Sequence, residues 1–265
     1  MKTLFKISIY FTSVILLFTL LTGCTNEATE TFTTLEELQY RRIGITLSAI
    51  QNQIANDRFP NANITEFNEQ MDSITALQAG RVDAAMVSYP TAFLVRKNIP
   101  ELTWIEEFVS HEQAGVGVRR GNTELLDEIN AVIDELKENG ILEDMIGRWY
   151  NMENPNYIMP DIPLPTEGTP LRVGVSADRE PSTFLAPNGD VIGLDAELAK
   201  RIAKHLNRPI EFIDMRMASF ALSLDSGQVD MVASNFLITD ILQEMVYFSQ
   251  AYFDTPFIMI VRRGR

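Results

Sequence analysis

One short motif occurs twice in this chain, and it constrains the fold more than any other feature. Residues 77–84 read Leu-Gln-Ala-Gly-Arg-Val-Asp-Ala, and residues 224–231 read Leu-Asp-Ser-Gly-Gln-Val-Asp-Met. In both copies a helical pattern ends at a glycine, which adopts a left-handed helix cap at little cost, and an apolar run typical of a buried parallel strand follows. Such junctions recur throughout α/β proteins, so one copy is weak evidence. Two copies, one in each half, predict two α/β lobes of related design.

The composition is that of a globular protein, and it argues against nucleic acid as a partner. The 265 residues are 46% apolar and 22% charged, which leaves room for two modest domains. The net charge is −14, whereas phosphate binding requires a basic surface. Two histidines and a single cysteine argue against a His/Cys metal site. We therefore expect no nucleic-acid partner, no metal and no cofactor.

The first 23 residues have the pattern of a secretory signal. Lys2 and Lys6 precede an apolar run at 7–21 that is short for a membrane span, although an uncleaved anchor is the alternative. Residues 21–24, Leu-Thr-Gly-Cys, resemble the lipobox of bacterial lipoproteins, whose cysteine becomes the lipid-modified first residue of the mature chain. We therefore expect a signal peptide at 1–23, lipidation of Cys24, and an exported protein anchored by acyl chains to the extracytoplasmic or periplasmic face of a membrane.

A proline-rich segment at 151–170 divides the rest of the chain, and its weak periodicity predicts a semi-extended linker. Residues 24–34 are polar and predict a tether. Before the linker we expect strands at 42–46, 63–67, 82–88, 102–108 and 114–118, with helices at 50–58, 69–79, 90–97, 123–139 and 142–150. After it we expect strands at 171–175, 210–214, 231–234 and 257–261, with helices at 194–206, 218–224 and 239–245.

Three local patterns refine these expectations. Thr34 and Glu37 have the spacing of a capping box at the start of a helical turn. Thr239 is placed to cap the helix at 239–245. In the helix at 69–79, Met71 shares one face with Ile74 and Leu77, so all three are predicted to be buried.

The sequence resembles the extracytoplasmic solute-binding proteins of ABC transporters. Among these it is most similar to the type that binds polar amino acids (family 3). Residues 191–200, Val-Ile-Gly-Leu-Asp-Ala-Glu-Leu-Ala-Lys, resemble the signature that follows the family's first strand. Further family motifs stand at 226–230, 238–240 and 248–253, and motifs of its second lobe at 79–84, 89–92, 120–125 and 147–150. The resemblance covers 35–265. It implies a two-lobed type II periplasmic-binding-protein fold, a mixed sheet flanked by helices in each lobe, and a monomer that delivers a small-molecule ligand to an ABC permease.

The order of the lobes differs from that of the family, where lobe 1 comes first. Here residues 35–150 match lobe 2 plus the family's C-terminal helices, and residues 171–265 match lobe 1. We interpret this order as a circular permutation, which proteins tolerate where their termini lie close together at the surface. The alternative is a fragment of a tandem array, with lobe 2 of one unit followed by lobe 1 of the next.

The resemblance also implies a ligand site in a cleft between two lobes that close about a hinge. In the family an arginine holds the ligand carboxylate and an acid holds its ammonium, and these positions here are Leu242 and Ser88. The other implied positions are Ser234, Asn235, Leu237, Met217, Phe184 and Pro181 in lobe 1, and Ser48 and Ile50 in lobe 2. We therefore expect an amino-acid-like or more apolar ligand, with Arg179 or Arg216 as an alternative source of a guanidinium.

Two other functions remain to be weighed against a receptor that captures a solute for uptake. A few relatives of this fold are enzymes, but no nucleophile–base pair or spaced carboxylate pair stands out here. Glu180, in a loop expected to face the cleft, is a candidate acid, although acids are common in surface loops. We therefore expect a binding protein and not an enzyme. A degenerate sensor or interaction module that no longer binds amino acids is the other alternative.

Overall fold

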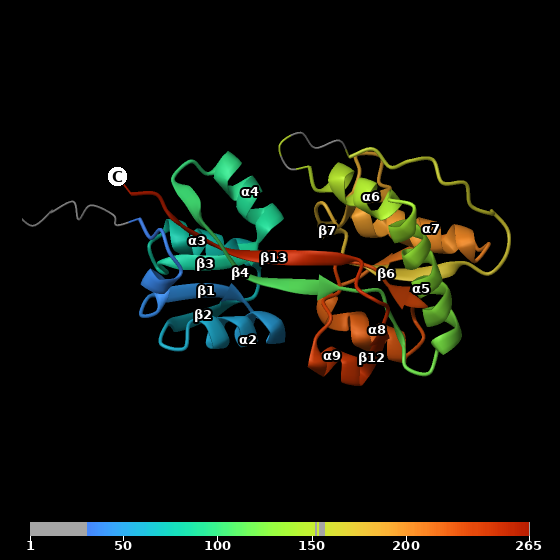
Figure 1. Cartoon of the computed structure of the whole chain (residues 1–265), viewed down its shortest axis with the longest axis horizontal. Helices are drawn as coiled ribbons and strands as arrows, with labels where there is room; N and C mark the ends of the chain where they lie inside the picture. Colours follow the sequence, from blue (N-terminus) through green and yellow to red (C-terminus); the bar gives the residue numbers. More distant parts are fainter. Residues whose placement is uncertain (1–30, 152, 154–156, 265) are drawn as a thin grey trace, which may run out of the picture.

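The computed structural model describes residues 31–151, 153 and 157–264 (Figure 1). The expected signal peptide and the lipidation site at Cys24 lie outside these residues. In this part of the chain, no helix has both the length and the apolar character needed to cross a membrane.

Two five-stranded mixed sheets form the centres of two lobes. We call lobe 2 the sheet ordered β2 (Asn63–Phe67), β1 (Arg42–Thr46), β3 (Ala84–Ser88), β13 (Phe253–Arg262) and β4 (Leu102–Ala114). We call lobe 1 the sheet ordered β10 (Ile210–Asp214), β6 (Leu171–Val175), β11 (Met231–Val232), β5 (Gly117–Arg119) and β12 (Val246–Phe248). The first three strands of each sheet are parallel, and the fourth is antiparallel to them.

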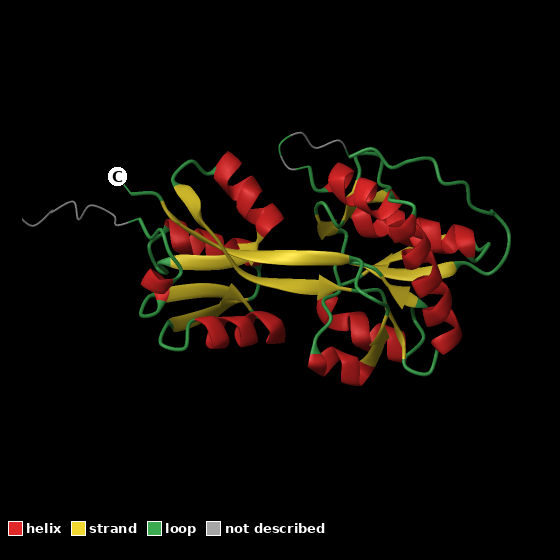
Figure 2. Cartoon of the chain, in the orientation of Figure 1, coloured by secondary structure: helices red, strands yellow, loops and turns green. Residues whose placement is uncertain are grey.

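Helices cover both sheets (Figure 2). In lobe 2 they are α2 (Ala49–Arg58), α3 (Gln70–Gln78) and α4 (Tyr89–Asn98), preceded by the short helix η1 (Glu36–Leu38). In lobe 1 they are α5 (Thr123–Glu138), α6 (Ile141–Trp149), α7 (Leu194–His205), η2 (Met217–Ser219), α8 (Phe220–Asp225) and α9 (Asp240–Met245). A small sheet of β7 (Asp178–Arg179), β8 (Thr183–Leu185) and β9 (Val191–Ile192) lies beside α7.

Each sheet takes its fourth strand from the other half of the chain. Strand β13 belongs to the C-terminal half but lies between β3 and β4 in lobe 2, and β5 belongs to the N-terminal half but lies between β11 and β12 in lobe 1. The long paired strands β4 and β13 run between the lobes (Figure 1). The prediction of two α/β lobes is confirmed.

The repeated motif adopts the same backbone conformation in both lobes. Gly80 and Gly227 have φ values of +71° and +73°, in the left-handed region that a glycine enters at little cost. Each ends a helix whose last turns are buried, and each leads into a buried central strand, β3 or β11. The sequence argument for these two junctions is confirmed.

Helix α5 is held onto lobe 1 by the segment that follows β12. The backbone N–H of Gln250 donates to Asn130 Oδ1 over 2.8 Å, and its side-chain amide donates to Asp134 Oδ1 over 2.6 Å. Lys137 Nζ donates to Gln250 Oε1 over 2.8 Å. The backbone and side chain of one glutamine therefore hold a helix that comes more than 100 residues earlier in the sequence.

Several sequence-based expectations need correction. The two strands expected at 102–108 and 114–118 are instead one long strand, β4, followed by the short strand β5. Strand β4 joins two lobes and exposes residues on both faces, so it lacks the alternation that marks a strand. Met71 is 57% exposed, although Ile74 and Leu77 are buried as predicted. Thr239 does cap α9, since its side chain accepts the N–H of Leu242 over 3.2 Å.

Candidate functional site

The strand register shows which edge of lobe 2 faces lobe 1. Strand β13 leaves lobe 1 at Phe253 and pairs antiparallel with β3, with Phe257 opposite Ser88 and Val261 opposite Ala84. The carboxyl end of β3 therefore points back toward lobe 1. Strands β1 and β2 are parallel to β3, so their carboxyl ends lie at the same edge.

The corresponding edge of lobe 1 faces the strands that join the lobes. Strand β11 pairs antiparallel with β5, with Met231 opposite Val118 and Val232 opposite Gly117. The chain enters β5 from β4, so the carboxyl end of β11 points toward β4. Open α/β sheets bind ligands outside the carboxyl ends of their strands, and here the two sheets turn these ends toward the same pair of connecting strands.

Ser234 stands at the carboxyl end of β11 and is fully buried. Its hydroxyl lies 2.7 Å from the hydroxyl of Thr183, and it accepts the backbone N–H of Ser176 over 3.0 Å. Thr183 also donates to the carbonyl of Ser176 over 2.8 Å. Ser234 therefore ties together the loops that follow β6 and β11.

Asn235 follows with φ +47°, a left-handed conformation that asparagine tolerates better than most residues. Its N–H donates to Asp195 Oδ2 over 2.5 Å, and its side-chain oxygen accepts the hydroxyl of Thr255 over 2.6 Å. Thr255 belongs to β13, and both side chains are buried. Asn235 therefore connects the edge of lobe 1 to a strand that leads into lobe 2.

Asp195 is a buried carboxylate in the first turn of α7. In addition to the N–H of Asn235 it accepts the hydroxyl of Tyr252 over 2.7 Å. Burial raises the pKa of Asp195 to about 6, although these two hydrogen bonds and the positive charge of Arg179 act in the opposite direction. Tyr252 is buried as well, and its own burial together with the nearby Asp195 carboxylate raises the pKa of its phenol well above the ordinary value.

Arg179 and Met217 meet at the same edge of lobe 1. Arg179 follows the carboxyl end of β6, and Met217 follows that of β10. Arg179 Nη1 lies 2.7 Å from Met217 Sδ. Arg216, the other arginine considered above, is exposed. Arg179, and not the exposed Arg216, therefore contacts Met217, which was expected in the site from the sequence.

Phe184 packs against the end of α6, and Pro181 contacts the start of α7. The Phe184 ring packs edge-on against Trp149 and Tyr157, with centroid separations of 6.3 Å and 5.2 Å. Pro181 is buried, and its carbonyl accepts the N–H of Leu194 over 3.1 Å. Burial and the nearby Glu180 carboxylate raise the pKa of Tyr157, so Glu180 is close to a phenol.

Leu237 and Leu242 serve in packing. Leu237 is buried and forms an isolated bridge to Ala114 at the end of β4. Leu242 is half-buried in α9 and packs against the apolar cluster that contains Phe220 and Phe236.

The expected residues of lobe 2 lie at the amino ends of two helices. Ser48 caps α2, because its hydroxyl accepts the N–H of Gln51 over 3.2 Å. Ile50 is half-buried and packs on the main core. Ser88 immediately precedes α4, and its hydroxyl lies 3.1 Å from that of Thr91. These contacts are internal to lobe 2.

The structure thus brings the expected residues together in small groups, and the sequence missed some of their partners. Asp195 and Thr183 make the contacts that position Asn235 and Ser234, yet neither was singled out. Asp195 does fall within the family signature at 191–200, which was the available signal. Among the described residues, no group of three or more His, Cys, Asp or Glu side chains could hold a metal ion.

Comparisons with known proteins agree with this picture of lobe 1. Residues 171–265 match the model of the bacterial extracellular solute-binding proteins, family 3. Over 124 residues the chain is 25% identical to the L-cystine-binding protein TcyJ of Escherichia coli (strain K12), which covers 46% of this chain and 47% of that protein. It is 36% identical over 94 residues to the arginine-binding extracellular protein ArtP of Bacillus subtilis (35% and 36%), and 32% identical over 103 residues to a probable histidine-binding protein of Neisseria gonorrhoeae (39% and 38%).

Solved structures give matches of the same kind. The arginine-bound domain 1 of TmArgBP is 34% identical, with a TM-score of 0.32 over 35% of this chain and 79% of that one. The probable amino-acid-binding protein ytmK of Bacillus subtilis is 12% identical, with a TM-score of 0.43 over 85% and 84%. The chain spans about half the length, or less, of the three curated relatives above. Residues 171–265 of this chain are therefore similar to the bacterial extracellular solute-binding proteins, family 3.

Proposed function

We propose that this protein is a lipid-anchored extracytoplasmic solute-binding protein that captures a small molecule between its two lobes for uptake by an ABC transporter. The family match of residues 171–265 supports a binding role, and the relatives bind cystine, arginine or, in one probable case, histidine. The lipobox-like residues 21–24 support the anchor. A monomer and an ABC permease partner follow from the same family resemblance.

One observation carries the proposal. The carboxyl ends of both central sheets point toward the paired strands β4 and β13, and the family-matching segment supplies one of these edges. Two lobes joined by a pair of strands can open and close about that connection, which is how hinged binding proteins enclose a ligand. The ligand then contacts Ser234, Asn235, Met217, Phe184 or Pro181 on lobe 1, and Ser48, Ile50 or Ser88 on lobe 2.

The ligand is amino-acid-like or more apolar than the ligands of the relatives. A zwitterion needs a cation for its carboxylate and an anion for its ammonium, since an unpaired buried charge is costly. At the two positions where the family supplies these groups, this chain has Leu242 and Ser88. A ligand with fewer charges fits these positions, and so does an amino acid held by other residues. We expect binding and not catalysis.

We further propose that the lobes are circularly permuted relative to the family. The family-matching lobe 1 segment is C-terminal here, and α5 and α6, which precede it in sequence, pack onto α7 within lobe 1. The N–H of Gly264 donates to the hydroxyl of Thr31, so the two ends of the described chain lie side by side. Joining residue 264 to residue 31 and opening the chain within 151–170 tests this. The rearranged chain is expected to unfold at the same temperature, whereas a tandem fragment would not tolerate the change.

The proposed function is tested by thermal unfolding of the chain from residue 25 with L-cystine, L-arginine, L-histidine, small peptides and apolar metabolites. A ligand that binds only the native state stabilises it by about 2.7 kcal/mol at a hundredfold excess over its Kd. A cooperative transition raised by one ligand class is the expected result. A transition that no compound shifts would favour the degenerate sensor, and no cooperative transition would favour the tandem fragment.

A variant ties the ligand to the edge of lobe 1. Ser234→Trp places a large ring at the carboxyl end of β11, where it is expected to abolish the ligand-induced shift. The variant counts only if it still unfolds cooperatively without ligand. An unchanged shift in a folded Ser234→Trp protein would contradict the site.

A further inference from the structure

Arg179 is a positively charged side chain whose burial the described part of the chain leaves largely uncompensated. Its Nε is buried and has no hydrogen-bond partner there. The one side-chain hydrogen bond of this guanidinium among the described residues joins Nη1 to Met217 Sδ, over 2.7 Å. A thioether sulfur is a weak acceptor, whereas a guanidinium carries five N–H donors. The described residues thus satisfy only a small part of the hydrogen-bonding capacity of Arg179.

The nearby carboxylates do not pair with Arg179. Asp178 accepts the hydroxyl of Ser176 over 2.8 Å. Asp195 accepts its two hydrogen bonds from Asn235 and Tyr252. Burial lowers the pKa of Arg179 below its ordinary value, and the attraction of Tyr150, Asp178 and Asp195 offsets only part of that effect. Both carboxylates therefore act on Arg179 through space alone.

Other arginines of this lobe show what a compensated guanidinium looks like. Arg172 donates to Asp230 Oδ1 over 2.6 Å and to the carbonyl of Gly227 over 2.7 Å. Arg208 donates to Asp230 Oδ2 and to two carbonyl groups. Among residues 31–151, 153 and 157–264, Arg179 has no such oxygen acceptor, although it follows β6 at the carboxyl edge of the sheet.

We propose that Arg179 is the anchor for an anionic group of the ligand, and that this group is a carboxylate. The planar guanidinium matches a carboxylate through two parallel N–H···O bonds. The residue is only half-buried, so part of Arg179 is exposed to solvent. Met217 then forms an apolar wall next to the bound group. This inference rests on the proposed function, because it names the chemistry by which the same edge recognises its ligand.

The proposal makes a prediction about the protein without ligand. Replacing Arg179 by Met removes an uncompensated cation and keeps a long apolar side chain, so the unfolding temperature of Arg179→Met is expected to exceed that of the wild type. Arg216→Met is the matched control, because Arg216 is exposed and one residue away from the same methionine. It is expected to leave the unfolding temperature unchanged. A lower unfolding temperature in Arg179→Met would show a structural role and overturn the proposal.

Ligand pairs that differ in the carboxylate supply the second test. L-arginine is compared with agmatine, L-histidine with histamine, L-cystine with cystamine, and phenylacetate with 2-phenylethanol, by thermal shift and calorimetric titration. At least one carboxylate is expected to bind the wild type and Arg216→Met, while its partner without the carboxylate is not. Arg179→Met is expected to bind that carboxylate about tenfold more weakly or worse, as for loss of a charge-assisted hydrogen bond.

The outcomes separate this inference from the proposed function. Binding of a compound without a carboxylate, with equal affinity in Arg179→Met, would leave the receptor standing and overturn the role of Arg179. Carboxylate binding that Arg179→Met retains in full would do the same. A folded wild type that none of these compounds stabilises would overturn both.

Discussion

Asp83 and Asp230 make the same contacts at equivalent places in the two lobes. Each carboxylate accepts, over 3.0 Å, the backbone N–H of an arginine at the start of the first strand, Arg42 in β1 and Arg172 in β6. Each also accepts the guanidinium of that arginine over 2.6 Å. The N–H of each aspartate returns a hydrogen bond to the carbonyl of the same arginine. The aspartate of the repeated motif therefore ties the loop after the glycine to the first strand of its own lobe.

This arrangement predicts that Asp83→Ala and Asp230→Ala destabilise the protein to a similar degree. Each substitution leaves a backbone N–H and a guanidinium without their acceptor, at a cost of about 1–3 kcal/mol. Urea unfolding of both variants gives the measurement. Asp225→Ala is the control, because Asp225 is exposed and belongs to the same repeated segment. Losses no larger than that of the control would contradict this role for the motif.

Because the pKa of Asp195 is raised in the folded protein, we expect the stability of the protein to depend on pH between about 4 and 7. Burial raises the pKa of Asp195 in the folded protein to about 6, above its ordinary value of 3.8. The folded state therefore holds a proton that the unfolded state releases in this range. The contribution of this group to the free energy of unfolding is full below the unfolded pKa and is lost as the pH rises through about 6. The contributions of Asp83 and Asp230 to stability depend on pH in the opposite direction, because their pKa values are lowered in the folded protein.

The acids of the repeated motif act at lower pH, which separates the two effects. Burial alone would raise the pKa values of Asp83 and Asp230, but the arginine hydrogen bonds outweigh it and hold both below the ordinary value. Their contribution is lost only as the pH falls below about 4. Urea unfolding at about pH 5 and pH 7.5, compared between wild type and Asp195→Asn, isolates Asp195. Between pH 7.5 and pH 5, the free energy of unfolding of the wild type is expected to rise by about 1 kcal/mol more than that of Asp195→Asn. Equal changes in the two proteins would contradict the prediction.

Adding a side chain at Gly193 is expected to cause a severe local steric clash. It precedes α7 with φ +126°, and a Cβ atom there would overlap the carbonyl oxygen of Ser182. That carbonyl accepts the N–H of Asp195 over 3.0 Å, so it cannot move away without loss of a helix cap. Gly193→Ala is expected to cost on the order of 3 kcal/mol or more in thermal or urea unfolding.

Gly147→Ala is the matched control for that substitution. Gly147 lies within α6, and apart from its chain neighbours and the backbone of the helix itself no described atom lies within 4 Å of the position of an added Cβ. Alanine is expected to stabilise this helix by about 0.5–1 kcal/mol. Similar effects of the two substitutions would refute the steric account of Gly193.

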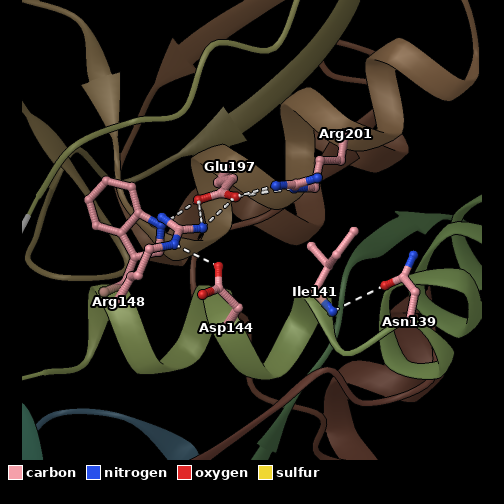
Figure 3. Close-up of polar contacts among 7 residues, drawn as sticks. Asn139, Ile141, Asp144, Arg148, Glu197 and Arg201 are labelled. Carbon is pink, nitrogen blue, oxygen red and sulfur yellow. Dashed lines mark hydrogen bonds and ion pairs between the residues drawn. The ribbon is translucent and has the colours of Figure 1, made fainter.

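The buried carboxylate of Glu197 in α7 is expected to hold α6 against α7. It is fully buried and accepts hydrogen bonds from Arg148, from Arg201 and, over 2.7 Å, from the indole N–H of Trp149 (Figure 3). Glu197→Ala leaves all three donors without their acceptor and is expected to cost about 3–5 kcal/mol, as measured by urea unfolding.

Asp144→Ala is the control, since Asp144 is an exposed partner of the same Arg148 at 2.8 Å. Exposed pairs are worth about 1 kcal/mol or less. A small loss in Glu197→Ala, equal to that of the control, would show that the buried network does not hold the two helices together.

The sequence predicted the regular parts of the fold because their local signals agree with the tertiary structure. The strands expected at 42–46, 63–67, 171–175 and 210–214 have the expected bounds, since these short segments are rich in the β-branched and aromatic residues that favour strands. The small sheet β7–β8–β9 was missed because strands of two or three residues have no measurable periodicity. The pairing of β13 with β4 depends on contacts between distant segments.

The candidate site was less accessible to sequence reasoning. Ser234 was expected at the end of a central strand, because the repeated motif marks that strand. Glu197 and Asp195 lie in the first turn of an amphipathic helix, where acids are ordinary surface residues, and only the structure shows that both are buried. The sequence offered Arg179 as an alternative source of a guanidinium, but only the structure shows that its Nε is buried without a hydrogen-bond partner among the described residues.

The central claim is that a ligand draws the two lobes together, and a distance measurement tests it most directly. A chain that starts at residue 25 lacks Cys24, the single cysteine, so labels can be introduced at chosen positions. Asp57 in α2 and Asp225 in α8 are exposed and lie in different lobes. Spin labels at Asp57→Cys and Asp225→Cys are expected to move closer together when the stabilising ligand is added. A distance distribution that stays unchanged at saturating ligand would contradict the account.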